Sequence, residues 1–131
     1  MNRCLVIDDS RTMRKIARSI LEEVHFDTAE AEDGEAALEY CRVEMPDLII
    51  LDFDLPGNRG LEFLRRLRLI ADGKEPVIVF CATEHDVGQI AEALKAGARE
   101  FVQKPFERKE LLTKVLATGL LQRPAASRPA A

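Results

Sequence analysis

Short runs of consecutive apolar residues alternate along the chain with longer segments in which apolar residues recur at every third or fourth position. Continuous apolar runs are typical of strands covered on both faces, and the longer spacing is typical of amphipathic helices. Their alternation is the pattern of repeated βαβ units, and it predicts a parallel sheet sandwiched between helices. The strands are predicted at residues 3–7, 27–31, 48–51, 77–81 and 100–103.

The helical segments carry start and stop signals at their ends. Ser10 or Thr12 can cap the first helix, and the second ends before Pro46 because the residue before a proline avoids helical geometry. A leucine stripe that includes Leu69 is expected to face the core from the third helix, and Gly97 suits the left-handed position that ends the fourth. The helices are predicted at residues 11–24, 34–43, 60–71, 87–96 and 107–121.

The chain length of 131 residues fits a single domain, which the periodic pattern places at residues 1–121. The following residues, 122–131, have the sequence QRPAASRPAA, in which prolines and small residues replace any apolar period. Such a segment has little to bury, so it is predicted to be a flexible tail.

Composition and charge exclude several classes of protein. Apolar residues make up 47% and charged residues 32%, as in a soluble globular domain. A net charge of −4 argues against a surface built for nucleic acid, so no DNA partner is expected. Apolar runs such as residues 48–51 are too short to span a bilayer, and the N-terminus lacks a signal pattern, so we expect a cytoplasmic protein without membrane insertion.

The cysteines show no paired or metal-binding spacing and are predicted to be reduced and buried: Cys4, Cys41 and Cys81.

Four of the predicted strands are followed by candidate site residues, and all of these except Ala82 are polar. Ligands of open parallel sheets bind beyond the carboxyl ends of the strands, so these residues are expected to meet at one edge of the fold. Taken singly, the acidic residues could be helix caps or turn residues and the lysine a turn residue, and only the joint pattern indicates a site. The residues are Asp8 and Asp9, Asp52, Ala82 and Thr83, and Lys104.

Crowded carboxylates repel one another, and a divalent cation relieves that repulsion. Mg²⁺ is predicted, because it prefers oxygen ligands and typically uses one or two carboxylates with water and a phosphate oxygen. Asp9 and Asp52 are the expected direct ligands, and Asp8 is expected to hold a metal-bound water. With the metal and Lys104 neutralising a phosphoryl group, Asp52 could attack phosphorus and form a labile acyl phosphate, which suits a signal.

The chain resembles the response regulator receiver domain, and in particular single-domain regulators of the chemotaxis type. The resemblance covers about residues 3–120 and rests on four motifs taken together. They are VIDDS at 6–10, AEDGEAAL at 31–38, PDLIILDFDLPGNRGLEFL at 46–64 and ALKAGAREFVQKPF at 93–106.

This resemblance implies an α/β fold of the flavodoxin-like type, a three-layer sandwich with a doubly wound five-stranded parallel sheet in the order 2-1-3-4-5. It implies Asp52 as the phosphoacceptor, Asp8 and Asp9 as the acidic metal-binding pair, and the backbone carbonyl of Asp54 as a further metal ligand. Lys104 would contact the phosphoryl group.

Two further family features map onto the fifth strand and its end. Phe101 falls where the family carries an aromatic residue that changes rotamer on activation, and the peptide bond before Pro105 is often cis in the family.

The sequence departs from the family pattern at the fourth strand. Counted back without gaps from Gly97, the family's hydroxyl residue falls on Ala82, and Thr83 comes one position late. Either the strand slips so that Thr83 reaches the phosphoryl oxygen, or Thr83 points away and that hydrogen bond is missing; the second is favoured. Asp54 and Glu84 are also expected to influence hydrolysis of the acyl phosphate.

The resemblance implies a phosphoacceptor signalling protein that catalyses only its own phosphoryl transfer and dephosphorylation. Its expected partners are a histidine kinase or phosphotransfer protein and a downstream protein that binds the fourth helix, fifth strand and fifth helix. The alternative is a binding module with weak or vestigial phosphorylation that acts through constitutive protein or anionic nucleotide contacts. Arg65, Arg66 and Arg68 on the third helix would serve such a nucleotide, although a solvated helix face is favoured.

Overall fold

Five parallel strands form one sheet in the order β2-β1-β3-β4-β5. This computed structural model describes residues 2–56, 59–73, 75–83 and 87–120. The predicted strand order is confirmed, and each strand lies within one residue of its predicted limits. The strands are β1 (Arg3–Ile7), β2 (Asp27–Ala31), β3 (Leu48–Asp52), β4 (Val77–Ala82) and β5 (Glu100–Gln103).

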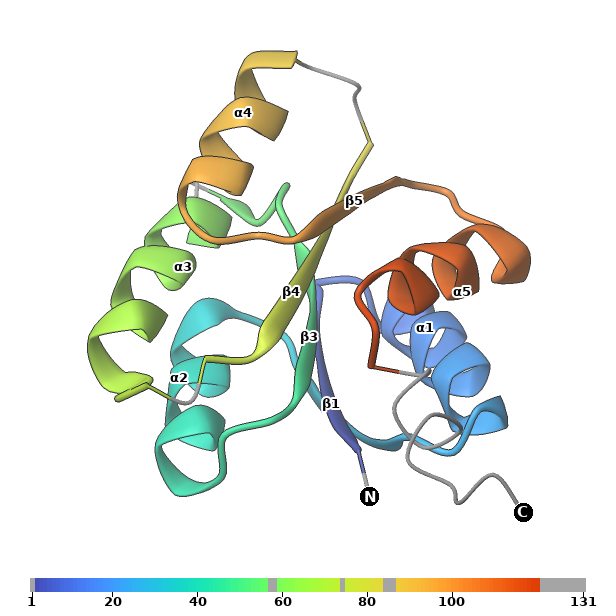
Figure 1. Cartoon of the computed structure of the whole chain (residues 1–131), viewed down its shortest axis with the longest axis horizontal. Helices are drawn as coiled ribbons and strands as arrows, with labels where there is room; N and C mark the ends of the chain where they lie inside the picture. The colour runs from blue at the N-terminus through green and yellow to red at the C-terminus, as the bar shows by residue number, and fades with distance from the viewer. Residues whose placement is uncertain (1, 57–58, 74, 84–86, 121–131) are drawn as a thin grey trace.

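Helices cover both faces of the sheet and complete the doubly wound α/β sandwich. Two of them, α1 and α5, lie on one face, and α2, α3 and α4 lie on the other (Figure 1). The helix limits agree with the predicted pattern except at α5, which ends earlier than expected. The helices are α1 (Arg11–Glu23), α2 (Gly34–Val43), α3 (Arg59–Ile70), α4 (Val87–Lys95) and α5 (Arg108–Ala117).

The central strand β3 is buried along its whole length and contributes to two separate cores. Successive side chains of a strand point to opposite faces of the sheet. Ile49 and Leu51 therefore pack on the side of α2, α3 and α4, whereas Leu48 and Ile50 pack on the side of α1 and α5. Continuing this alternation, the side chain of Asp52 lies at the α1 and α5 side of the sheet edge.

One predicted core position on α3, that of Leu69, is wrong. Leu69 is 85% exposed, whereas Phe63, Leu64 and Leu67 are buried. Leu69 follows Leu67 by two positions, and two positions turn a helix by about 200°, so the two side chains cannot share one face. The helix also approaches the residue after β3 closely, because a Cβ on Gly60 would lie 3.0 Å from the Cα of Phe53.

Other predictions about the chain have simple outcomes. The three cysteines are free and buried, as predicted. Among the residues that the structure describes, no helix is long and apolar enough to cross a membrane. Glu84, Leu121 and the predicted tail at 122–131 lie outside the described residues.

The N-terminus of α2 allows a direct test of local structure. Asp33 caps this helix, and its carboxylate accepts a hydrogen bond of 2.8 Å from the backbone N–H of Ala36. We expect Asp33→Ala to lower the free energy of unfolding by about 1 kcal/mol, because that donor loses its partner. Urea denaturation measures the change. Asp33→Asn keeps an oxygen acceptor and should stay near wild type, and an equal loss in both variants would contradict the capping role.

Candidate functional site

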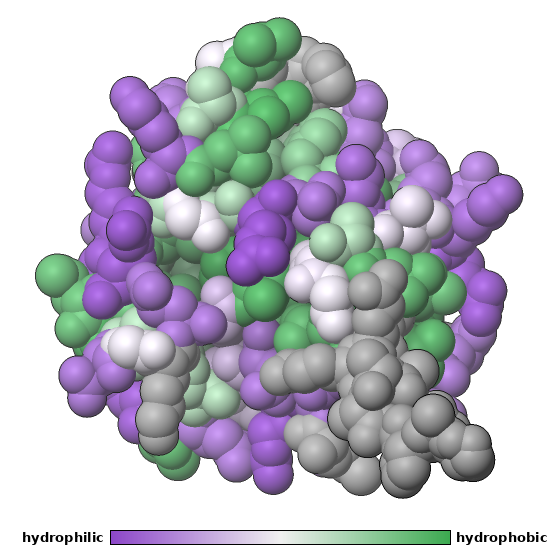
Figure 2. All heavy atoms as spheres, viewed as in Figure 1, coloured by the Kyte–Doolittle hydropathy of each residue, from purple (hydrophilic) through white to green (hydrophobic). Residues whose placement is uncertain are grey.

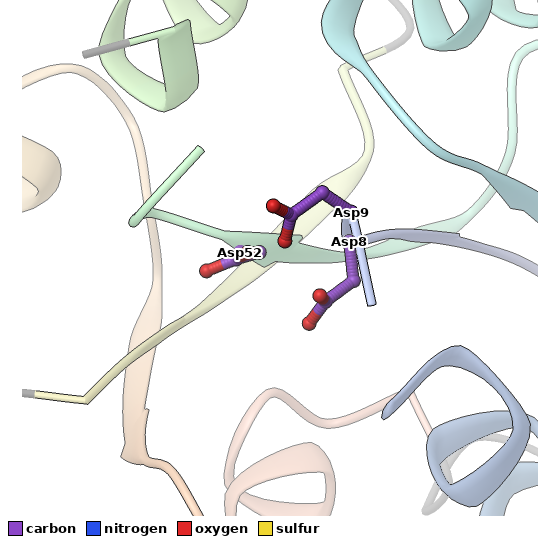
Figure 3. A group of neighbouring side chains, drawn as sticks. All are labelled: Asp8, Asp9 and Asp52. Carbon is purple, nitrogen blue, oxygen red and sulfur yellow. The ribbon is translucent and has the colours of Figure 1, made fainter. Parts of the chain in front are cut away.

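Three carboxylates gather where β1 and β3 end. Asp8 and Asp9 follow β1, and Asp52 is the last residue of the neighbouring parallel strand β3 (Figure 3). One oxygen from each side chain lies within 4.8 Å of the other two. Asp8 and Asp52 are only 5% and 2% exposed, whereas Asp9 is open to solvent. The structure thus brings together the acidic residues that the sequence singled out.

Lys104 contacts this cluster although its strand lies two positions away from β3 in the sheet. It follows β5, which is separated from β3 by β4, and its backbone N–H donates to the carbonyl of Ala82. Its Nζ lies 3.0 Å from Asp8 Oδ2 and 3.2 Å from Asp52 Oδ1. The peptide bond between Lys104 and Pro105 is cis, as the family resemblance implied.

Burial and charge set the protonation of the cluster. Burial raises the pKa of Asp52 to about 6, and the charge of Asp8 adds to the rise. The Asp54 N–H and the Lys104 ammonium act in the opposite direction on the same pKa. Burial alone would lower the pKa of Lys104, but the hydrogen bond to Asp8 and the nearby carboxylates raise it above its usual value. Lys104 therefore remains a charged ammonium. Asp52 beside it is ionised above about pH 6.

Asp54 has two separate sets of contacts. Its backbone N–H donates to Asp52 Oδ1 at 2.9 Å. Its side chain is directed away from the acidic cluster, because Oδ2 accepts hydrogen bonds from the Thr83 N–H at 2.7 Å and from Thr83 Oγ1 at 3.0 Å. The predicted use of the Asp54 carbonyl as a metal ligand stays a prediction.

The strand pairing corrects the assignment of Ala82. Asp52 pairs with Cys81 in the parallel register of β3 and β4. The side chain of Ala82 packs with Phe80 in the core below α2, α3 and α4, which is the opposite face of the sheet. A shift of one residue along a strand reverses the direction of the side chain, so Ala82 cannot face Asp52. The Thr83 hydroxyl donates to Asp54 instead, and its relation to a phosphoryl group on Asp52 stays a prediction.

Cys81 is the residue beside Asp52 that sequence reasoning missed. Its side chain belongs to the core on the α1 and α5 side, the side to which Asp52 also points. Burial raises the pKa of its thiol, so the thiol stays protonated. The observation that identifies Cys81 is its pairing with Asp52 across two strands, which is a long-range contact and has no local signal in the sequence.

Phe101 lies in a row of aromatic rings that begins next to the acidic cluster. Phe53 follows Asp52 directly, its ring centroid is 5.4 Å from that of Phe80, and the Phe80 centroid is 4.9 Å from that of Phe101. Phe101 is half-buried on β5. The proposed change of rotamer at this residue stays a prediction.

The donor set of the cluster fits a small hard cation. Carboxylate oxygens from Asp8, Asp9 and Asp52 are the ligand type that Mg²⁺ prefers, and the exposed Asp9 leaves the site open to water. Ser10 already donates its N–H to Asp8 Oδ1 at 2.8 Å, and Lys104 holds Oδ2. Asp8 is therefore better suited to a water-mediated contact with the cation, and Asp9 and Asp52 to direct contacts.

Residues 4–116 match the response regulator receiver domain family, and the chain belongs to that family. It is thus a receiver domain of two-component response regulators, a class of signalling proteins that bind Mg²⁺ at an acidic pocket. Protein CcdB of Bacillus subtilis (strain 168) is 39% identical over 116 residues, which cover 88% of this chain and 95% of that protein.

Other relatives extend beyond the matched region. The DNA-binding response regulator MtrA of Mycolicibacterium smegmatis is 38% identical over 115 residues, which cover 88% of this chain and 49% of MtrA. The chain therefore spans about half the length of this relative. Among solved structures, chemotaxis protein CheY4 of Vibrio cholerae superposes with a TM-score of 0.83 at 28% identity, covering 89% of this chain and 98% of that one. The beryllofluoride-activated receiver domain of DrrB superposes with a TM-score of 0.78 at 25% identity.

Proposed function

We propose that this receiver accepts a phosphoryl group on Asp52 in a Mg²⁺-dependent reaction. The observation that carries the proposal is the position of the Asp52 carboxylate, which lies within 4.8 Å of oxygens of Asp8 and Asp9 and 3.2 Å from Lys104 Nζ. Bound there, Mg²⁺ would neutralise charge on the phosphoryl oxygens and on the carboxylates. A histidine kinase or phosphotransfer protein would supply the group from a phosphohistidine.

The transfer would use the side chain of Asp52 and the hydrogen-bonding groups around it. An oxygen of Asp52 attacks phosphorus, the bond from phosphorus to the donor nitrogen breaks, and the imidazole leaves with the bonding electron pair. Lys104 Nζ, held by Asp8, is placed to donate a hydrogen bond to a phosphoryl oxygen. The Asp54 N–H orients the Asp52 carboxylate for attack. The protein catalyses only its own phosphoryl transfer and the later hydrolysis.

The output surface proposed for this receiver comprises α4, β5 and α5. Apolar side chains gather over α4 (Figure 2), where Val87 and Leu94 are exposed. An exposed apolar patch of this kind suits a protein partner. The relatives include DNA-binding regulators, but half of their length lies outside the match, so the expectation that this domain itself does not bind DNA stays a prediction.

The alternative function, constitutive binding of an anionic nucleotide, receives less support. Of the arginines on α3, Arg66 pairs with Glu35 and Arg68 lies 4.0 Å from Glu75. These carboxylates offset the positive charge that an anionic ligand would need. A partner-binding module without phosphorylation is a separate alternative, and one experiment distinguishes it from the proposed function.

The test is to incubate the protein with acetyl phosphate and Mg²⁺ and to weigh it intact. We expect an adduct of about 80 daltons, which is the mass that one phosphoryl group adds. Chelation of Mg²⁺ before the donor is added should prevent the adduct, because the crowded carboxylates then repel the phosphate. Absence of any adduct in the Mg²⁺-loaded protein would favour the binding module.

A further inference from the structure

A side-chain bridge links the segment after β3 to the residue after β4. Asp54 Oδ2 accepts two hydrogen bonds from Thr83, one from the backbone N–H and one from the hydroxyl. Through its own N–H, Asp54 also contacts Asp52 Oδ1. Asp54 thus makes direct hydrogen bonds both to the proposed phosphoacceptor and to Thr83, four positions before the start of α4.

The bridge extends further, to the last residue of β5. The carbonyl of Thr83 accepts a hydrogen bond of 3.4 Å from Gln103 Nε2, and Gln103 directly precedes Lys104. The contacts therefore run from Asp52 through Asp54 and Thr83 to the end of β5. Each of these side chains lies at the carboxyl edge of the sheet, outside the packed cores.

The residue of β4 that faces Asp52 cannot provide an equivalent link. Cys81 occupies the paired position, and a thiol is a weak hydrogen-bond donor. The hydroxyl of Thr83, the next residue on that side, already donates to Asp54 rather than towards Asp52. A bond from a hydroxyl and an amide to a charged carboxylate is stronger than any bond a thiol could make.

We propose that Asp54 is a positioning residue that transmits the state of Asp52 to the end of β4 through Thr83. The inference rests on the proposed function, because it concerns the response of the protein to a group attached to Asp52. Modification of Asp52 changes the oxygen that accepts the Asp54 N–H, and the Asp54 backbone shifts in response. Because the Asp54 carboxylate is hydrogen-bonded to Thr83, Thr83 moves as well. The bridge exists before phosphorylation, so the signal is a movement of an existing link and not the formation of a new bond.

The test uses amide NMR with beryllofluoride and Mg²⁺, which mimic the phosphoryl group on a receiver. The measured quantity is the change in the Thr83 amide and Gln103 side-chain amide shifts when Asp52 becomes saturated. The Ser10 amide, which donates to Asp8 on the other side of the site, reports occupancy in every variant. Asp54→Ala is expected to lose about half or more of the Thr83 and Gln103 response relative to Ser10, since it removes hydrogen bonds to a charged group.

Asp54→Asn is the conservative control, because its amide oxygen can still accept from Thr83. We expect it to retain most of the wild-type response. In the absence of beryllofluoride, the Thr83 amide should exchange with solvent about tenfold faster in Asp54→Ala than in Asp54→Asn. Faster exchange together with the lost response would support the relay.

Two outcomes would overturn the inference, and they have different meanings. If Asp54→Ala transmits a full response from a saturated Asp52 to Thr83 and Gln103, the relay is wrong while the proposed function is unaffected. If the wild-type protein shows no response at Ser10 either, Asp52 does not accept the mimic, and both the proposed function and the relay are wrong.

Discussion

Asp52→Asn is expected to abolish the phosphoryl adduct and, at pH 8 without Mg²⁺, to stabilise the fold by about 1 to 3 kcal/mol. The first effect arises because an amide is not a phosphoacceptor in this chemistry. The second arises because the pKa of Asp52 rises from 3.8 to about 6 on folding. That rise corresponds to about 3 kcal/mol of destabilisation once the carboxyl is ionised in both states.

The pH dependence gives this prediction its sign. A carboxyl group whose pKa is higher in the folded state costs no stability below the unfolded value of 3.8. The cost grows between pH 3.8 and about 6 and is complete above that range. The advantage of Asp52→Asn over wild type should therefore be large at pH 8 and small at pH 4.

Urea denaturation with a chelator present, at pH 4 and at pH 8, measures the difference. Asp33→Asn is a suitable control, since it removes an exposed carboxylate outside the cluster and keeps the helix cap. An Asp52→Asn protein that is less stable than wild type at pH 8 would show that the acidic cluster does not strain the fold.

Lys104→Met is expected to have the opposite effect on stability. The substitution removes the ammonium that lies 3.0 Å from Asp8 and 3.2 Å from Asp52 and leaves two buried carboxylates without a cation. Removing one partner of a buried ion pair costs about 3 to 5 kcal/mol, and we expect a loss of that size at pH 8 without Mg²⁺. Adding Mg²⁺ should recover part of it, because the metal compensates the same carboxylates.

Phosphorylation should also slow in Lys104→Met, by about a hundredfold or more, because one donor to the phosphoryl oxygens is lost. The rate of adduct formation from acetyl phosphate measures this effect. Lys114→Met is the matched control, because Lys114 lies 3.7 Å from Glu100 in a partly exposed pair. Its loss should cost less than about 1 kcal/mol and leave the rate unchanged. Normal phosphorylation of Lys104→Met would remove Lys104 from the proposed mechanism.

The outcomes for Asp52→Asn and Lys104→Met test one physical statement about the site. Three carboxylates and one ammonium leave an excess of negative charge at a site where Asp8 and Asp52 are buried. Removing a negative charge relieves this excess, and removing the positive charge worsens it. The same excess is what makes the cluster a binding site for a divalent cation.

Local sequence pattern was sufficient to predict the secondary structure and the edge at which the site lies. The apolar run at residues 48–51 is buried on both faces of the sheet, and such a run has few alternatives in a soluble protein. Capping by Ser10 and the left-handed Gly97 are also local, because each depends on a few neighbouring residues. Convergence of Asp8, Asp9, Asp52 and Lys104 was predictable because parallel strands end at a common edge.

Tertiary structure alone decided which residue of β4 faces Asp52. The pairing of β3 with β4 selects Cys81, whereas a count along the chain from Gly97 selected Ala82, because such a count contains no information on strand register. The bridge from Asp54 to Thr83 also depends on how separate segments are placed against one another. Periodicity determines which face of an element is apolar, whereas register and long-range contacts are set only when the elements pack.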